Sequence, residues 1–366
     1  MTSESIRVPA AQLITLVARM FAATGLSTTA AERVAKGLVE ADLEGLPSHG
    51  VMLVDMYIER IHRKSVSSQE AADIVSDRNT AIVLDAGHAL GHLTGEQAMT
   101  LAVERAKRLG VAVVAVRHGF HFGTAGRYAQ LAADSGCIGI AMCNTRPLMP
   151  APGGAERVVG NNPLAVAVPC AGPIPILLDM ATSEAAMGKI RMADKAGRPI
   201  PDNWAVKADG TPTINAAEAI AGMLLPSGGP KGFGLAFTID LICGLLSGGA
   251  IGNGVQPLYG DSSVPYDCSH LFLAIDVAHF CDLDIFRSRA AAAAEHVRSS
   301  RRARGTGALL SPGEPAWQKR ERSGDHVQIT MPVAQMLLRI ASELGVSTAP
   351  LDAILQPAQV IGHAQA

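Results

Sequence analysis

The sequence lacks an excess of charge of either sign. Its 366 residues include 31 lysines and arginines against 33 acidic residues, which gives a formal net charge of −2. A chain with so little net charge creates no field that would attract nucleic acid or an anionic membrane. The short basic run over residues 298–304 has the pattern of a solvated helix end. We therefore expect neither nucleic acid nor a membrane among the partners of this protein.

Cysteine and histidine patterns for metal binding are also missing. The six cysteines are scattered, without CxxC or any other zinc-ligand spacing. This distribution favours reduced thiols over a disulfide scaffold or a zinc site. The sequence contains no HExxH motif, which speaks against a metal-dependent hydrolase that uses the histidines. We expect no metal at the functional site.

No stretch has the length of a membrane span or the pattern of a signal peptide. The most apolar helix candidate, residues 233–246, is too short to cross a bilayer and contains Asp240, so we interpret it as a core helix. Residues 1–5 lack the basic and apolar regions of a secretory signal. Together with the thiols, these absences favour a cytoplasmic location.

The common nucleotide-binding motifs are absent as well. No GxGxxG follows a predicted strand with an acidic residue about 20 positions later, which argues against a Rossmann domain. The stretch 224–234 places several glycines and Lys231 at the start of a predicted helix, an arrangement that suits a phosphate group. It is not a Walker A loop, because no Ser or Thr follows Lys231.

What the sequence does have is a large apolar fraction, 48% of its residues, and 37 glycines. Such a chain can bury a large core, which we expect to be divided into two or three lobes. Segments with the helical period alternate with short β-branched segments, the pattern of an α/β or α+β fold. Helices are predicted over residues 8–21, 28–42, 94–109, 124–134, 184–193, 233–246, 283–301 and 332–344, and strands over 81–85, 111–116, 138–143, 164–168, 174–178 and 271–277.

The segment Ser48-His49-Gly50 is the first candidate for chemistry. Apolar residues after it recur with the helical period, and Ser48 is a preferred N-cap residue, so a helix is predicted to begin there. His49 would then lie at a helix N-terminus, which favours a neutral imidazole and a nearby anion. Such a histidine can transfer a proton near pH 7. The commoner alternative is a surface histidine that merely opens a helix.

Two further residues could join such a site. His121 lies in a glycine-rich turn between a predicted strand and a predicted helix, where it could transfer a proton or bind a ligand, or simply bond to the turn backbone. Asp179 ends a strand just before Ser183, which could cap the next helix. A carboxylate there could hold the tautomer of an active-site histidine, although a capping role for Asp179 is the commoner case.

Taken together, six motifs resemble the type 2 malate/L-lactate dehydrogenase family, which includes ureidoglycolate and sulfolactate dehydrogenases, diketogulonate reductases and cyclic-imine reductases. They occur in family order over residues 10–345. The motifs are Ser48-His49-Gly50, His121-Phe122-Gly123 with Ala125-Gly126 and Tyr128, Gly160-Asn161-Asn162-Pro163-Leu164, Asp179-Met180-Ala181-Thr182-Ser183, Gly229-Pro230-Lys231-Gly232 and Pro312-Gly313-Glu314.

The resemblance implies a non-Rossmann nicotinamide-binding fold with a mostly antiparallel sheet, usually in a homodimer. It implies hydride transfer between NAD or NADP and a small molecule, either a 2-hydroxy/2-oxo acid or a cyclic 2-imino acid. It also suggests an N-terminal helical lobe over residues 1–75, a central lobe over 76–118 and 300–366, and a cofactor-binding domain over 119–299. A relative that binds a nucleotide or an acid without turnover is the alternative of a different class.

By the same similarity, His49 would be the acid that protonates the carbonyl oxygen or imine nitrogen, with Asp179 supporting it. His121 stays a second candidate, because members differ over which histidine transfers the proton. The positions that match the family's cofactor site, with Lys231 near the phosphates, are His121, Thr145, Asp179, Met180, Ala181, Thr182, Ser183, Lys231, Gly313 and Glu314.

The substrate side departs from the family pattern at one position. Members commonly have arginine three residues after the Ser-His-Gly glycine, and this chain has Leu53. Leucine cannot make the bidentate contact with a carboxylate that arginine makes. Arg146, at the end of a predicted strand, is our candidate for the replacing cation, and Ser48 and Leu53 would line the same pocket. This departure puts malate, with its second carboxylate, in doubt as the substrate.

Overall fold

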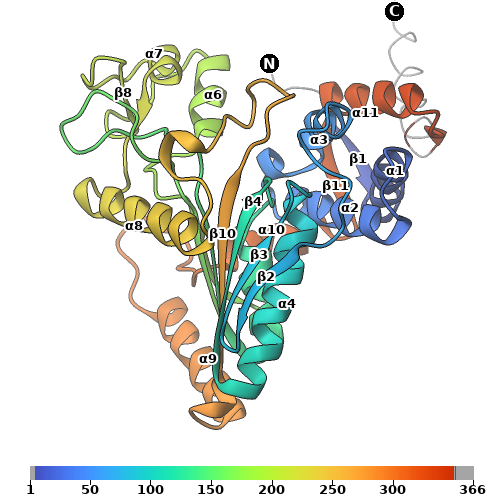
Figure 1. The fold of residues 1–366 in the computed structure, drawn as a ribbon. Helices are drawn as coiled ribbons and strands as arrows, with labels where there is room; N and C mark the ends of the chain where they lie inside the picture. Colours follow the sequence, from blue (N-terminus) through green and yellow to red (C-terminus); the bar gives the residue numbers. More distant parts are fainter. Residues whose placement is uncertain (1–4, 350, 352–366) are drawn as a thin grey trace, which may run out of the picture.

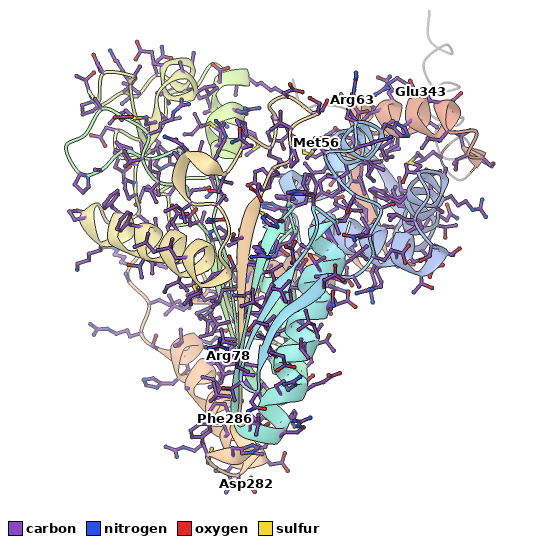
Figure 2. The ribbon with its side chains drawn as sticks, viewed as in Figure 1. Met56, Arg63, Arg78, Asp282, Phe286 and Glu343 are labelled. Atoms are coloured by element: carbon purple, nitrogen blue, oxygen red, sulfur yellow. The ribbon has the colours of Figure 1, made fainter. Side chains whose placement is uncertain are left out.

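The structure is a computed structural model that describes residues 5–349 and residue 351. Two groups of helices lie at the wide upper end of a wedge, and a long sheet with its covering helices narrows toward the lower end (Figure 1). Asp282 and Phe286 lie at this narrow end, whereas Met56 and Arg63 lie at the opposite, wide end (Figure 2). The sheet therefore links the two upper lobes.

The central sheet has seven strands in the order β2-β3-β4-β10-β5-β6-β7. Among these strands, β3 and β4 pair in parallel and the other neighbours pair antiparallel, which confirms the predicted mostly antiparallel sheet. The bounds are β2 (Asp73–Arg78), β3 (Ala81–Asp85), β4 (Val111–Gly119), β5 (Cys137–Cys143), β6 (Leu164–Val168), β7 (Ile176–Met180) and β10 (Cys268–Asp276).

Helices cover both faces of this sheet. Along β4 the side chains alternate, because successive residues of a strand point to opposite faces. Val114 and Val116 join the core under α4 (Gly91–Leu109) and α5 (Ala125–Asp134), while Ala115 joins a smaller core under α8 (Pro230–Ser247). The strand is thus buried on both faces, as its β-branched sequence indicates.

The N-terminal lobe is closed by the C-terminal part of the chain. β1 (Ser5–Pro9) pairs antiparallel with β11 (His326–Thr330), and α11 (Met331–Glu343) contacts α1 (Ala10–Ala23) and α3 (Val54–His62). The other helix of this lobe is α2 (Thr28–Leu43), which Ser27 caps by accepting the Ala30 N–H. The sequence pattern did not indicate the β1–β11 pair. The predicted boundaries of the three lobes stay a prediction, and residues 352–366 of the central lobe lie outside the described part.

A small lobe is inserted between β7 and α8. It contains α6 (Met187–Lys195), α7 (Ala216–Ala221) and the short pair β8 (Ala205–Val206) and β9 (Met223–Leu224). The predicted cap at Ser183 is wrong. α6 begins three residues later than predicted, with Ala186 at its N-cap, and the Ser183 hydroxyl donates to the Ala185 carbonyl.

The sequence analysis interpreted the apolar helix α8 as a core helix, but only one side of it is buried. Its buried stripe consists mostly of small or polar residues, which allows the backbone to approach β10, β4 and β5 closely. Large apolar side chains face outward instead, with Leu245 and Leu246 60% and 61% exposed. Within the described residues, α8 is also the one helix whose length and composition would allow it to cross a membrane, a test that core helices of soluble proteins pass too. The remaining helices are α9 (Leu283–Ser299) and α10 (Glu314–Ser323).

Candidate active site

The segment around His49 forms two short 3₁₀ turns instead of the predicted helix N-terminus. The first covers Pro47–His49 and the second Val51–Leu53, and α3 begins only at Val54. Gly50 separates them because its backbone is extended, with φ −96° and ψ −158°. His49 therefore ends a 3₁₀ turn, and the predicted effect of a helix dipole does not apply. Burial lowers the pKa of the His49 imidazole, so the expected neutral ring arises from desolvation.

The fold brings His49 and His121 together. Their rings stack with centroids 5.5 Å apart and planes 26° apart, although 71 residues of chain separate them. His121 follows β4 at the start of the turn that leads into α5. The Ser48 hydroxyl lies 3.0 Å from His49 Nδ1 and so holds one side of that ring. Two of the predicted proton-transfer residues thus share one site, with Ser48 beside them.

Tyr57 is the residue that the sequence analysis missed. Its hydroxyl lies 2.6 Å from His121 Nδ1, and its side chain is fully buried. The Tyr57 O–H needs an acceptor in this buried position, and Nδ1 is the partner that the described contacts provide. His121 then carries its proton on Nε2. The sequence did carry a signal for Tyr57. Its polar hydroxyl lies on the otherwise apolar face of the helix that follows Ser-His-Gly.

Burial keeps both members of this pair neutral. The pKa of His121 lies well below its ordinary value because of burial, and nearby His49, His92 and His270 lower it further. The pKa of Tyr57 lies well above 10, again mainly because of burial. His121 therefore offers a neutral Nε2–H as a hydrogen-bond donor, not an imidazolium.

Asp179 lies on the His121 side of the site. Its carboxylate accepts the Gly126 N–H at 2.8 Å and so caps the start of α5. Asp179 keeps exposed surface, yet the protein surrounds its carboxyl group closely enough for desolvation to raise the pKa, a shift that the Gly126 hydrogen bond opposes. No hydrogen bond or ion pair in the described part of the chain joins Asp179 to His49.

The two predicted substrate contacts differ in exposure. Leu53 is 1% exposed and belongs to the core of the N-terminal lobe. Arg146 is half-buried after the end of β5, and none of the described ion pairs includes it. Burial lowers the pKa of Arg146, and the like charges of Arg157 and Arg191 lower it further. A half-buried guanidinium without a carboxylate partner suits an anionic ligand.

Several predicted cofactor residues lie on separate stretches of chain that hydrogen bonds join to one another. Thr145 donates its backbone N–H to the Asn162 side chain at 2.8 Å, and the Thr182 N–H donates to the Asn161 carbonyl at 3.0 Å. The buried Thr182 hydroxyl has no partner in the described structure. Met180 and Ala181 connect β7 to Thr182. An unpaired buried hydroxyl beside this segment fits a bound polar group.

The start of α8 fits a phosphate group. Gly228 and Gly229 have φ values of +62° and +63°, which favour glycine. A side chain at either position would meet no atom within 4 Å, so the backbone there is open. The first N–H groups of a helix have no partner within the helix and carry partial positive charge. Lys231, in the first turn of α8, is exposed and adds a cation.

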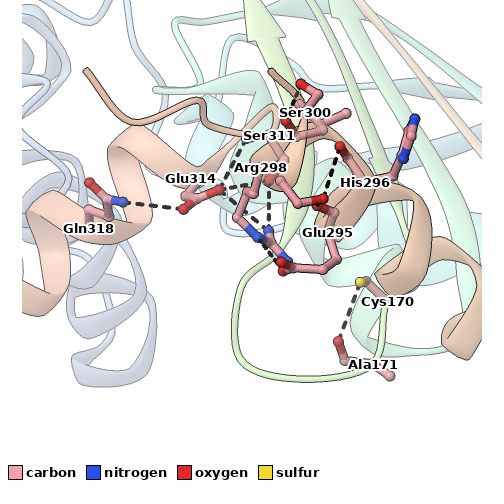
Figure 3. A network of polar contacts seen from close by, with 11 residues as sticks. Cys170, Ala171, Glu295, His296, Arg298, Ser300, Ser311, Glu314 and Gln318 are labelled. Carbon is pink, nitrogen blue, oxygen red and sulfur yellow. Dashed lines mark hydrogen bonds and ion pairs between the residues drawn. The ribbon is translucent and has the colours of Figure 1, made fainter. Parts of the chain in front are cut away.

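Glu314 has a structural position at the start of α10. Its carboxylate accepts hydrogen bonds from the Ser311 backbone and hydroxyl, from Arg298 and from Gln318 (Figure 3). Burial opposes its ionisation, but these contacts lower the pKa of Glu314 overall. Gly313, with φ +90°, packs so closely on Leu177 of β7 that a side chain would overlap it. This turn therefore attaches α10 to the strand that carries Asp179.

The two histidine turns, the segment after β7 and the start of α8 all lie within the range that one family model covers. The family model for malate/L-lactate dehydrogenase matches residues 8–337. This chain belongs to that family. It is 36% identical over 305 residues to malate dehydrogenase of Pyrococcus abyssi, covering 81% of this chain and 83% of the relative. It is 32% identical over 324 residues to the ureidoglycolate dehydrogenase (NAD(+)) of Escherichia coli K12, covering 88% and 92% of the two chains.

Solved structures of family members have the same fold. The sulfolactate dehydrogenase of Methanocaldococcus jannaschii superposes with a TM-score of 0.90 at 32% identity, covering 96% of this chain and all of that chain. The delta1-piperideine-2-carboxylate reductase of Pseudomonas syringae superposes with a TM-score of 0.81 at 25% identity, covering 93% and 100%. The predicted fold is therefore confirmed as that of the malate/L-lactate dehydrogenase family.

Proposed function

We propose that this chain is an NAD(P)-dependent oxidoreductase that transfers a hydride between nicotinamide and a 2-hydroxy/2-oxo acid. The single observation that carries the proposal is the stacked pair of His49 and His121 in a chain of this dehydrogenase family. The cofactor is NAD or NADP, since relatives are named for either one. The six cysteines are all free thiols, which supports a cytoplasmic location.

His49 is the proposed proton-transfer group. Its ring is half-buried, Ser48 holds it at Nδ1, and its lowered pKa keeps it neutral. A neutral ring can accept the hydroxyl proton of a 2-hydroxy acid and return it when the 2-oxo acid is reduced. His121, which Tyr57 holds with Nε2 protonated, donates a hydrogen bond to the substrate. Asp179 supports this side of the site by fixing the start of α5.

The residues that would hold the cofactor lie across the end of the sheet. Thr145 and the segment 179–183 line one side, and the start of α8 with Lys231 would bind phosphate groups. When bound, the nicotinamide supplies or accepts the hydride. Gly313 and Glu314 contribute by attaching α10 to β7.

The acid group of the substrate is proposed to bind Arg146 and Ser48. Arg146 has an unpaired guanidinium, which can hold a carboxylate through two hydrogen bonds. Leu53 lies in the buried core of the N-terminal lobe, so the structure does not support its predicted contact with the substrate. A second candidate substrate is a cyclic 2-imino acid, because position 53 supplies no cation for the second carboxylate of malate, and a reductase named for a cyclic 2-imino acid has the same fold.

The test measures oxidation of NADH and of NADPH by absorbance with pyruvate, oxaloacetate, a branched 2-oxo acid, and pyrroline- and piperideine-2-carboxylate, together with ureidoglycolate in the oxidative direction. Turnover with an open-chain acid supports the first candidate. Turnover with the cyclic imines alone supports the second. Absence of turnover across the panel, with nucleotide binding shown by fluorescence, would contradict both candidates and favour a relative without catalytic activity.

We also propose that the protein is a homodimer that uses the outward face of α8. Leu235, Leu245 and Leu246 form an exposed apolar stripe on this helix, and such stripes are usually covered by a partner. Light scattering should give twice the mass of one chain, and Leu245→Asp should lower it to that of a monomer. Ile74→Asp changes another exposed apolar residue, on β2, and should leave the dimer intact. Loss of the dimer in Ile74→Asp, together with an intact dimer in Leu245→Asp, would contradict this interface.

A further inference from the structure

Asp42, near the end of α2, lies directly behind the turn that carries His49. Its carboxylate Oδ2 accepts the Val51 N–H at 2.8 Å. Val51 begins the second 3₁₀ turn, so this N–H has no partner within the turn itself. Asp42 therefore acts as an N-cap for the segment that continues into α3, although it lies nine residues earlier in the chain.

Gly50 shows how closely this carboxylate fits. A side chain on Gly50 would overlap all three carboxylate atoms of Asp42. The carboxylate thus occupies the space beside the residue at which the backbone changes direction, from the turn of Pro47–His49 to that of Val51–Leu53. Without the Asp42 carboxylate, the backbone at Gly50 could change its conformation. The position of the His49 ring depends on that conformation.

The carboxylate is retained in spite of an energetic cost. None of the described ion pairs includes Asp42, and burial raises its pKa to about 7, a shift that the Val51 hydrogen bond opposes. A partly buried acid without a cation destabilises a fold unless its contacts compensate. Alanine at this position would avoid the cost, which points to a role for the carboxylate in shaping the turn.

The His121 turn is built in the same way. Asp179, from β7, accepts the Gly126 N–H at the start of α5, and a side chain on Gly126 would come within 2.7 Å of its Oδ2. Each histidine therefore stands on a turn whose following helix is capped by a carboxylate from another element. In each case a glycine leaves room for that carboxylate.

We propose that Asp42 is a positioning residue for His49, and that it sets the place of the ring by holding the backbone break at Gly50. Asp179 has the corresponding task at the His121 turn. This inference rests on the proposed function, in which His49 transfers the proton. It assigns the support of the two histidines to two different carboxylates.

The experiment compares Asp42→Ala, which removes the acceptor, with Asp42→Asn, whose amide oxygen can still accept the Val51 N–H. Hydrogen exchange of the Val51 amide, kcat, and the affinity for NADH or NADPH are measured for each. We expect Asp42→Ala to exchange Val51 faster and to lower kcat by roughly tenfold to a hundredfold, the scale of a small misplacement. Cofactor affinity should stay within about twofold of wild type, because the nucleotide lies on other elements. Asp42→Asn should keep most of the wild-type kcat.

The control is Asp55→Ala, since Asp55 lies in the first turn of α3 and pairs with Arg339 at the surface. It should leave both Val51 exchange and kcat unchanged. Unchanged Val51 exchange in Asp42→Ala, or faster exchange with wild-type kcat, would overturn the proposal. So would equal loss of kcat in Asp42→Asn and Asp42→Ala. Retained turnover in His49→Ala would instead contradict the proposed function, without affecting the exchange result for Val51.

Discussion

At the scale of single residues, the two site histidines differ in what holds their rings. Ser48 contacts Nδ1 of His49 through a hydroxyl at the surface of the site, whereas Tyr57 contacts Nδ1 of His121 from the core. A buried tyrosine hydroxyl has few rotational alternatives, so His121 is held in one tautomer. His49 has no such buried partner in the described structure, and this freedom suits a group that gains and loses a proton.

Replacement of His49 by alanine should lower kcat by roughly a hundredfold or more, because general acid–base catalysis contributes at least that much. The affinity for NADH or NADPH, measured by fluorescence titration, should stay close to that of wild type. Turnover within about tenfold of wild type would contradict the role of His49 in proton transfer. The same measurement on His121→Ala then tests the second candidate.

Tyr57→Phe should remove the hydrogen bond that holds His121 in one tautomer. Nitrogen-15 NMR of histidine-labelled protein should show Nε2 protonated in wild type and a mixture of tautomers in the variant. The loss of one hydrogen bond should lower kcat roughly threefold to tenfold. Tyr128→Phe is the matched control, since the Tyr128 hydroxyl donates to the Phe122 carbonyl and not to a histidine. An unchanged His121 tautomer in Tyr57→Phe would show that another group sets it.

At the scale of elements, α3 fixes the connection between α8 and β10. Arg60 of α3 is 1% exposed, and its guanidinium donates to the carbonyls of Pro257, Leu258 and Val264. The same connection carries Tyr266, whose ring packs on Phe120 next to His121. A single cation thus replaces regular secondary structure in holding this loop beside the site.

Arg60→Met should destabilise the protein by roughly 2 to 4 kcal/mol, because three partly buried carbonyls lose their donor at once. Urea unfolding measures this change. Arg63→Met, which like Met56 lies at the wide end of the molecule (Figure 2), removes an exposed ion pair with Glu59 and should leave the urea midpoint nearly unchanged. Equal midpoints for the two variants would mean that the loop does not depend on Arg60.

At the scale of the whole molecule, the N-terminal lobe meets the upper end of the sheet (Figure 1), and the stacked His49 and His121 join these two parts. The core of that lobe extends to Phe120, Tyr266 and Cys268, which belong to the ends of β4 and β10 or adjoin them. Buried histidines gather at this junction. Burial lowers the pKa of His92 and of His270 to about 3 in each case.

These pKa values predict that acid destabilises the protein. Between pH 3 and 6.5 the unfolded chain protonates His92 and His270 and the folded chain does not, so the free energy of unfolding rises with pH across this range. Asp42 acts in the opposite direction. Because its pKa in the folded chain is about 7, its contribution to the free energy of unfolding falls as the pH rises from about 4 to 7. His49 and His121, whose pKa values burial also lowers, act with His92 and His270, whereas Asp179, whose pKa burial raises, acts with Asp42. The histidines outnumber these carboxyl groups, so the net stability should decrease on acidification below pH 6.5.

Urea unfolding between pH 4 and 8 tests this balance. His270→Phe, which keeps an aromatic ring next to Phe122, should reduce the loss of stability in acid. His296→Phe makes the same replacement at an exposed histidine of α9 and serves as the control for the substitution itself. A wild-type slope in His270→Phe would show that this histidine is already protonated in the folded state, contrary to its burial.

The sequence alone determined the elements with strong local signals and the family motifs. The helical period placed α2, and the β-branched segments placed β3, β4 and β6 to within a few residues. Neighbouring residues encode these features, because local period and capping depend on contacts within one element. The same motifs predicted His49, His121 and Asp179 as site residues, and the structure brings the two histidines together.

Only the tertiary structure decided how those residues are held. The break at Gly50 follows from Asp42, the tautomer of His121 from Tyr57, and the β1–β11 pair joins the two ends of the described chain. The sequence did not predict the outward apolar face of α8 for a similar reason, since composition does not tell which side of a helix meets the sheet. Each feature depends on contacts between residues that are distant in sequence, and local period carries no information about such contacts.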